Sequence, residues 1–388
     1  MRKVSLLVAV ALTLGLMVAP AVMAKEIKVG GIYDITGPTS DVGKDYGTGA
    51  VAAEKYINGK GGIDGDTIKL IPNDYAYKIP EAVNLYKKYL SVDKVFVIQG
   101  WGTGDTNALK PLVNKDKVVF LSASYDGTLT DPKENPYNFF IGTDYSTSIR
   151  AAIKFAKDQG AKKFVFIYPD HPYGKNPIPA GMEYAKEVGL EIGPDQIVDL
   201  KAIDATSQLL AMKNFDPEFA WIGGTTASAA VIIKDAAKLG LRTKFVINCW
   251  GFDENLAKLA GEAAEGRAFG MVPVAPFGAD VPGMKDVVAS AGGQSYTVHY
   301  VKSWVSNLVM AEGLKRAKKA GKLDAPGLKA ALETIKDFDT GGLTAPITFT
   351  PTDHRPNTTL TIYTVGKGGS MQKIQEVTMP RDPKQAGK

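Results

Sequence analysis

Short apolar segments recur along this chain, and each is followed by a turn and a longer amphipathic segment. Polar and apolar residues do not alternate within the apolar segments, which is typical of strands buried on both faces of a parallel sheet. The strand segments are Ile27–Ile32, Thr67–Ile71, Val95–Ile98, Val118–Leu121, Phe164–Tyr168, Phe219–Ile222 and Phe245–Ile247, and the helical segments are Gly43–Asn58, Pro80–Leu90, Thr106–Val113, Thr147–Asp158, Ala180–Val188 and Ser228–Leu239. This order predicts an α/β fold with doubly wound parallel sheets.

The alternation forms two successive series with a break near residues 139–144, so we expect two lobes. Beyond residue 272 the helical segments Ser295–Lys319 and Ala325–Ile335 come first, and strand segments around Thr344–Phe349 and Thr359–Val365 follow. Late helices followed by late strands indicate a chain that returns to complete both lobes. We predict that residues 25–143 and 273–338 form the first lobe, and that residues 144–272 and 339–388 form the second.

Residues 1–24 have the pattern of a secretory signal. Arg2 and Lys3 precede the apolar run Val4–Val18, and the small residues of Ala21–Ala24 suit a signal peptidase. The run is short for a membrane span, and no later stretch reaches the roughly 20 apolar residues that a bilayer requires. We predict cleavage near Ala24 and an exported protein that does not span the membrane.

Composition argues against several classes of function. The net charge is +5, and loss of Arg2 and Lys3 with the leader lowers it to +3, too little to indicate nucleic acid as a partner. Cys249 is the only cysteine, and the three histidines are too far apart for a metal-site spacing. No nucleophile motif or phosphate-binding loop occurs, so we expect no enzyme, no cofactor and no metal.

Polar and glycine-rich residues follow two neighbouring strand segments. Thr103 and Gly104 come after the third strand, where a helix is expected to begin near Asp105 or Thr106, and Ser124 comes after the fourth. In doubly wound sheets ligands bind beyond the carboxyl ends of the strands, and hydroxyls beside a helix N-terminus suit an anion. These residues predict a site for one carboxylate; ordinary turn and cap chemistry is the alternative.

Aromatic residues also gather where the strands end. They are Tyr33, Tyr75, Trp101, Tyr125, Tyr173, Trp250 and Phe252. Each by itself is compatible with core packing, but the set predicts a wall around an apolar or planar ligand.

Several segments resemble the type I periplasmic solute-binding proteins. They are IKVGGIYDITGP at residues 27–38, AEKYINGKGGI at residues 53–63, Tyr173-Gly174, and GGLTAPITFT at residues 341–350. The nearest branch is the leucine/isoleucine/valine-binding family, which serves branched-chain amino acid ABC importers. The resemblance covers nearly all of the chain after the leader. It implies two Rossmann-like lobes that are joined by a three-segment hinge and close on a ligand between them.

The resemblance also implies roles for single residues. A ligand carboxylate would be held by Thr103 and by groups at Ala123 and Tyr125, and Tyr173 would contact the ligand from the second lobe. One departure concerns the ligand ammonium. The family's amino-acid binders place a glutamate where this chain has Trp250.

A tyrosine that assists the same glutamate in the family corresponds here to Thr225. We therefore expect the carboxylate site to be kept and the ammonium site to be lost, unless Asp126 or Asp253 replaces it. Because Trp250 can pack flat against an apolar group, a hydrophobic or aromatic carboxylate without an α-amine is expected to bind better than leucine, isoleucine or valine. A branched-chain amino acid whose ammonium meets an aspartate or backbone carbonyls stays open.

The sequence thus predicts a monomeric periplasmic substrate-binding protein whose partners are a small-molecule ligand and the permease and ATPase subunits of an ABC importer. A ligand-sensing subunit of a membrane receptor would have the same fold and is the second hypothesis. The predicted ligand-binding residues are Trp101, Thr103, Gly104, Ala123, Ser124, Tyr125, Tyr173, Thr225 and Trp250.

Overall fold

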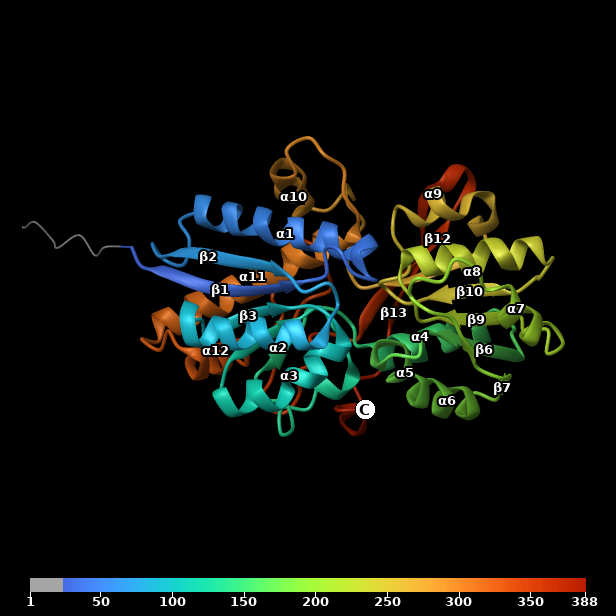
Figure 1. Ribbon diagram of the computed structural model, residues 1–388, viewed down its shortest axis with the longest axis horizontal. Helices are drawn as coiled ribbons and strands as arrows, with labels where there is room; N and C mark the ends of the chain where they lie inside the picture. The colour runs from blue at the N-terminus through green and yellow to red at the C-terminus, as the bar shows by residue number, and fades with distance from the viewer. Residues whose placement is uncertain (1–23) are drawn as a thin grey trace, which may run out of the picture.

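The computed structural model describes residues 24–388, so the predicted leader lies outside the described residues except for Ala24. The chain forms two halves side by side, each built around its own β-sheet (Figure 1). The predicted fold class is confirmed, because both halves are α/β layers built on parallel strands, to which the second half adds two antiparallel pairings at one edge. Within residues 24–388 we find no helix that is both long enough and apolar enough to cross a membrane.

The sheet of the first half is parallel and has the strand order β2-β1-β3-β4-β5. Its central strands are buried along their whole length, which explains their unbroken apolar sequences. The strands are β1 (Glu26–Tyr33), β2 (Thr67–Asp74), β3 (Val97–Gly100), β4 (Val119–Ser122) and β5 (Asn138–Phe139).

Helices from distant parts of the chain cover this sheet. The helix α1 packs along α11, although more than 200 residues separate them in the sequence (Figure 1). The late helices α10 to α12 therefore belong beside the first sheet. The helices of this half are α1 (Ser40–Gly59), α2 (Ile79–Lys88), α3 (Thr103–Asp116), α10 (Met284–Ser290), α11 (Val298–Lys319) and α12 (Ala325–Leu332).

The sheet of the second half has the order β13-β12-β11-β10-β9-β6-β7, and β8 also pairs with β6. The strand β12 is antiparallel to β11, and β13 is antiparallel to β12. The strands are β6 (Lys163–Tyr168), β7 (Glu191–Ile192), β8 (Gln196–Ile197), β9 (Phe219–Ile222), β10 (Lys244–Ile247), β11 (Ala268–Val272), β12 (Thr359–Val365) and β13 (Met371–Thr378), and the helices are α4 (Tyr145–Asp158), α5 (Pro172–Lys175), α6 (Ile178–Glu187), α7 (Thr206–Lys213), α8 (Thr226–Lys238) and α9 (Leu256–Ala260).

Two expected elements differ from the structure. Residues Thr344–Phe349 form no strand; Thr344 bridges to Val274 and Ile347 bridges to Phe338, so two different partners take the segment, and Pro346 between them has no N–H to donate. The helix expected near Asp105 begins at Thr103 instead, because Gly102 is extended (φ −84°, ψ 163°) and acts as its N-cap residue.

The chain passes between the two sheets three times, after β5, after β11 and after α12. The third connection contacts the first half as it leaves. Nδ1 of His354 donates to the Asn138 carbonyl (3.0 Å), and Nε2 lies 3.0 Å from a carboxylate oxygen of Glu333. The precise residues at which one lobe gives way to the other stay a prediction.

Candidate functional site

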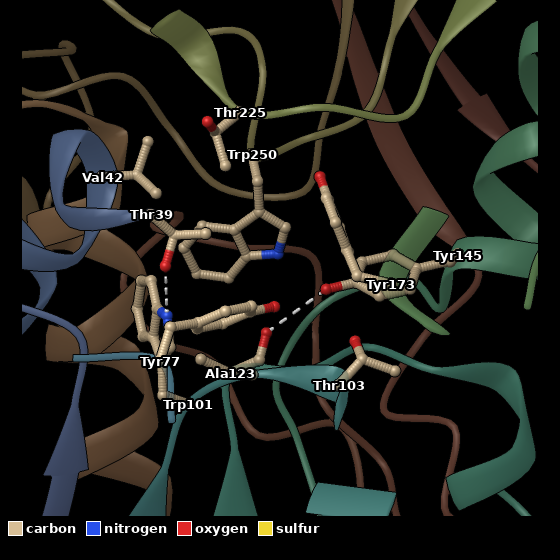
Figure 2. Close-up of a pocket in the computed structure, with 11 residues that line it drawn as sticks. Thr39, Val42, Tyr77, Trp101, Thr103, Ala123, Tyr145, Tyr173, Thr225 and Trp250 are labelled. Carbon is tan, nitrogen blue, oxygen red and sulfur yellow. Dashed lines mark hydrogen bonds between the residues drawn. The ribbon is translucent and has the colours of Figure 1, made fainter. Parts of the chain in front are cut away.

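A small cavity lies between the two halves, beyond the carboxyl ends of strands from both sheets (Figure 2). About 280 Å³ between the lining residues is free of protein atoms, and part of this space is open to solvent. This position is the one where doubly wound sheets bind ligands, because loops rather than strands provide the lining there. The lining residues are Thr39, Val42, Tyr77, Trp101, Gly102, Thr103, Ala123, Tyr145, Tyr173, Thr225 and Trp250.

Six of the nine predicted ligand-binding residues line this cavity, and they come from both halves. Trp101, Thr103 and Ala123 follow β3 and β4 of the first sheet. From the second half come Tyr173 on α5, and Thr225 and Trp250 after β9 and β10.

The other three predicted residues, Gly104, Ser124 and Tyr125, lie behind the lining. A side chain at Gly104 would meet His171, whose Nε2 is 2.8 Å from the position of a Cβ. The Ser124 hydroxyl is 2.7 Å from the Thr103 hydroxyl, so it supports a lining residue. The Tyr125 ring stacks on Phe140, with the ring centroids 5.4 Å apart.

Three lining residues with polar side chains escaped the sequence analysis: Thr39, Tyr77 and Tyr145. Their sequence signals are weak, since Thr39 lies in the turn after β1 and Tyr145 begins α4 after a crossing. Tyr75 was among the aromatic residues at strand ends that were predicted to wall the ligand, but it is buried and donates to Asp105 (2.7 Å). Positive φ angles at Ala76 (50°) and Tyr77 (58°) turn the loop, and Tyr77 reaches the cavity.

A chain of hydrogen bonds holds the Trp101 ring in place. Its Nε1–H donates to the Thr39 hydroxyl (2.8 Å), which in turn donates to Oδ2 of Asp34 (2.7 Å). Asp34 also accepts from the backbone N–H groups of Gly37 and Thr39, so its buried carboxylate is well satisfied. The indole nitrogen of Trp101 is therefore used within the protein and is not available to a ligand.

The second indole, that of Trp250, has the opposite arrangement. Its ring stacks nearly parallel on His299 (centroids 5.1 Å apart, 9° between planes) and meets the edge of Trp101 (5.1 Å, 68°). Its Nε1–H is buried and has no hydrogen-bond partner among the described residues. In Figure 2 this nitrogen points into the cavity. Trp250 thus turns its N–H, rather than the face of its ring, toward the cavity, with the Tyr145 hydroxyl beside it. The sequence had predicted a ring lying flat against the ligand.

Hydroxyl groups surround the same space. The side chains of Tyr77, Thr103 and Tyr145 direct their oxygens toward the point that the Trp250 nitrogen faces (Figure 2). Burial raises the pKa of Tyr77 and of Tyr145 well above the usual value, so both phenols stay protonated at neutral pH. The Tyr145 hydroxyl donates to the Ala123 carbonyl (3.5 Å), so the Tyr77 hydroxyl and the Trp250 N–H are the donors that these residues leave for a ligand.

None of the lining residues is charged. The two aspartates that were candidates for an ammonium partner are engaged elsewhere: Asp126 accepts from Asn176 (2.5 Å), and Asp253 from His299 (3.1 Å). Neither lines the cavity. Among residues 24–388 no cluster of side chains suits a metal ion.

Direct contacts join the two halves around the cavity. Asp41 on α1 accepts a hydrogen bond from the backbone N–H of Ala227 on α8 (2.9 Å). The Asp126–Asn176 bond crosses between the halves in the same way. The described conformation is therefore one in which the halves meet over the site.

A cavity between two parallel α/β halves, with lining from both, defines a two-lobed ligand-binding protein. The family profile described as periplasmic binding protein matches residues 26–370. The chain belongs to this family, and its Leu/Ile/Val-binding branch, expected from the sequence, is confirmed. These proteins are solute-binding proteins and not enzymes.

Similar proteins span most of the chain. The Leu/Ile/Val-binding protein of Citrobacter freundii is 23% identical over 246 residues, which are 63% of this chain and 66% of that protein, slightly less than two thirds of its length. The structure of a substrate-binding protein of an ABC transporter from Aeropyrum pernix is similar at 33% identity, covering 94% of this chain and 98% of the other (TM-score 0.87). The structure of a fatty acid ABC transporter substrate-binding protein from Thermomonospora curvata is similar at 21% identity, covering 92% of this chain and 93% of the other (TM-score 0.82).

Proposed function

We propose that this protein is the extracytoplasmic substrate-binding component of a branched-chain-amino-acid-type ABC importer and that it holds a small carboxylate-bearing ligand in the cavity between its lobes. The observation that carries the proposal is the lining itself. The Trp250 N–H and the Thr103, Tyr77 and Tyr145 hydroxyls face one space. A group that accepts several hydrogen bonds at once suits this arrangement, and a carboxylate can accept four or so.

The ligand that we favour has an apolar or aromatic body and no α-amine. An ammonium buried without a carboxylate partner costs several kcal/mol, and the lining contains no carboxylate. Among similar proteins, the Citrobacter relative is named for amino acids and the Thermomonospora one for fatty acids, which carry no amine. A branched-chain amino acid, with its ammonium on backbone carbonyls such as that of Ala123, is the rival ligand.

Calorimetric titration with matched pairs of ligands separates these two cases. Leucine is compared with 4-methylpentanoate, and phenylalanine with 3-phenylpropanoate, because each pair differs only in the α-amine. We expect the deaminated acids to bind at least about tenfold more tightly. Tight binding of leucine together with no binding of 4-methylpentanoate would establish the amino acid as the ligand and would contradict our assignment.

The cellular context is part of the same proposal. We propose that the leader is removed near Ala24, that the mature protein works as a monomer in the periplasm, and that it delivers its ligand to a permease driven by ATPase subunits. Amino-terminal sequencing of the secreted protein should begin at or near Lys25. Ligand uptake by cells should depend on the gene for this protein, and a strain that transports normally without it would argue for a sensing role.

A further inference from the structure

Lys302 is a completely buried lysine that lies directly behind the site. It is on α11 of the first half and its exposed fraction is 0%. Its Nζ donates to the Cys249 carbonyl (2.5 Å) and is 3.3 Å from Nδ1 of His299. The same nitrogen lies 4.0 Å from the centroid of the Trp250 ring. No carboxylate within the described residues forms an ion pair with it.

The hydrogen bonds around Lys302 define its charge and that of its neighbours. Because an ionised Asp253 can only accept, Nε2 of His299 donates to it (3.1 Å), and in the neutral ring Nδ1 is then the acceptor that faces Lys302. Burial lowers the pKa of His299 to about 4, and the ring is neutral at pH 7. The hydrogen bond from His299 lowers the pKa of Asp253 against the effect of burial, which leaves the carboxylate ionised. A neutral imidazole, that of His299, therefore lies between the Lys302 nitrogen and the Asp253 carboxylate.

The lysine is best satisfied as an ammonium. An ammonium has three donors, and the Cys249 carbonyl and the His299 nitrogen take two of them. The face of Trp250 occupies the remaining side, and a ring face attracts a cation. A neutral amine would turn its lone pair toward one of these electron-rich partners. Burial lowers the pKa of Lys302, and the surrounding acidic groups Asp253 and Glu254 oppose that shift.

This ammonium acts on the cavity through Trp250. The cation lies at the ring, and the unpartnered Nε1–H of the same ring points into the cavity. A cation at the face of an indole withdraws electron density, which strengthens the N–H as a donor. An anion bound to Nε1 would lie roughly 7 Å from the ammonium, where unlike charges attract appreciably in a protein interior.

We propose that Lys302 is the positioning residue that gives the cavity its preference for an anionic ligand, a role that rests on the function proposed above. Lys302 contributes from the first half, whereas Cys249 and Trp250 belong to the loop after β10 of the second. The charge is therefore brought behind the Trp250 ring when the two halves meet. A ligand that neutralises the field of Lys302 stabilises this closed arrangement.

The test measures charge preference and not affinity alone. Titrations compare 3-phenylpropanoate with 3-phenylpropanamide, which has nearly the same shape and no charge, in the wild-type protein, Lys302→Gln and Lys302→Met. Lys302→Gln keeps a donor for the Cys249 carbonyl. The control is Lys319→Gln, which changes the net charge equally at an exposed position of the same helix.

We expect the wild-type protein to prefer the acid to the amide by about tenfold or more, and the Lys302 variants to lose that preference while binding the amide within about threefold. Lys319→Gln should keep the preference. Equal losses for acid and amide would mean that Lys302 serves packing only and would overturn the inference. Equal binding of both ligands by the wild-type protein overturns it without any variant. A wild-type protein that binds only amino acids overturns the proposed ligand class as well.

Discussion

Replacing Thr103 by valine removes one hydroxyl from the cavity and leaves the shape of the side chain almost unchanged. Thr103 is the first residue of α3, is 1% exposed and lines the cavity. If Ser124 donates to the Thr103 hydroxyl, the Thr103 proton is free for a ligand carboxylate. A hydrogen bond to a charged group contributes about 1.5–3 kcal/mol, so the dissociation constant for 3-phenylpropanoate should rise about 10- to 150-fold.

The same substitution has a calculable effect on stability. Valine leaves the buried Ser124 hydroxyl without its partner, which costs about 1–3 kcal/mol. The melting temperature without ligand should therefore fall by roughly 2 °C or more. The double variant Thr103→Val/Ser124→Ala removes both hydroxyls. Because no unpaired group remains, its melting temperature should return most of the way to the wild-type value.

Calorimetric titration and thermal melting of the single and double variants distinguish a ligand contact from a structural one. Ser124→Ala is the matched control, since it removes a hydroxyl that does not line the cavity, and its affinity should stay within about threefold of wild type. The double variant should recover stability but not affinity. Unchanged affinity in Thr103→Val, or affinity restored by the second substitution, would refute a direct contact between Thr103 and the carboxylate.

Three further predictions concern pH, the contact between lobes, and closure. Burial raises the pKa of Asp105 to about 7, so the folded state binds a proton that the unfolded state releases near pH 4. The stabilisation from this proton is complete below the unfolded pKa and is lost as the pH rises toward 7. Thermal melting between pH 4 and 8 should show this loss in the wild-type protein and not in Asp105→Asn. A loss of stability with rising pH that persists unchanged in the variant would assign it to another group. Asp41→Ala removes the hydrogen bond to the Ala227 N–H and should weaken ligand binding by a few fold through faster release, which stopped flow measures. The melting temperature without ligand should change little. An unchanged release rate would mean that this contact adds nothing to closure. Small-angle scattering should show a smaller radius of gyration with ligand than without it, as the proposed lobes 25–143 with 273–338 and 144–272 with 339–388 close, and identical profiles would contradict a hinge.

The position of the site followed from local sequence patterns. A strand buried on both faces has an unbroken apolar sequence, and the residues just after it must lie at the carboxyl edge of the sheet. Trp101 and Thr103 were found in this way, and they line the cavity. The rule says where a loop begins but not how it turns. It selected Tyr75 and missed Tyr77, because positive φ angles at two adjacent residues decide which ring faces the ligand.

The tertiary structure also decided how Trp250 is used. The sequence places this residue after a strand, and an indole there can stack on a ligand or donate to it. His299 comes 49 residues later in the chain, yet it covers one face of the ring, and Lys302 lies against the ring as well. Only the packing of α11 from the first half onto the loop after β10 brings these groups together.

Fold class, the two-lobed organisation and the place of the site could be read from the chain, since each depends on residue periodicity within about 20 positions. The strand expected at Thr344–Phe349 did not form because its two ends bridge to different segments, one of which, at Val274, is 70 residues away in the sequence. The charge and the donors that a ligand meets were likewise beyond the sequence. They depend on long-range pairs, such as Asp253 with His299 and Lys302 with the Cys249 carbonyl, that form only when helices far apart in the sequence are packed together.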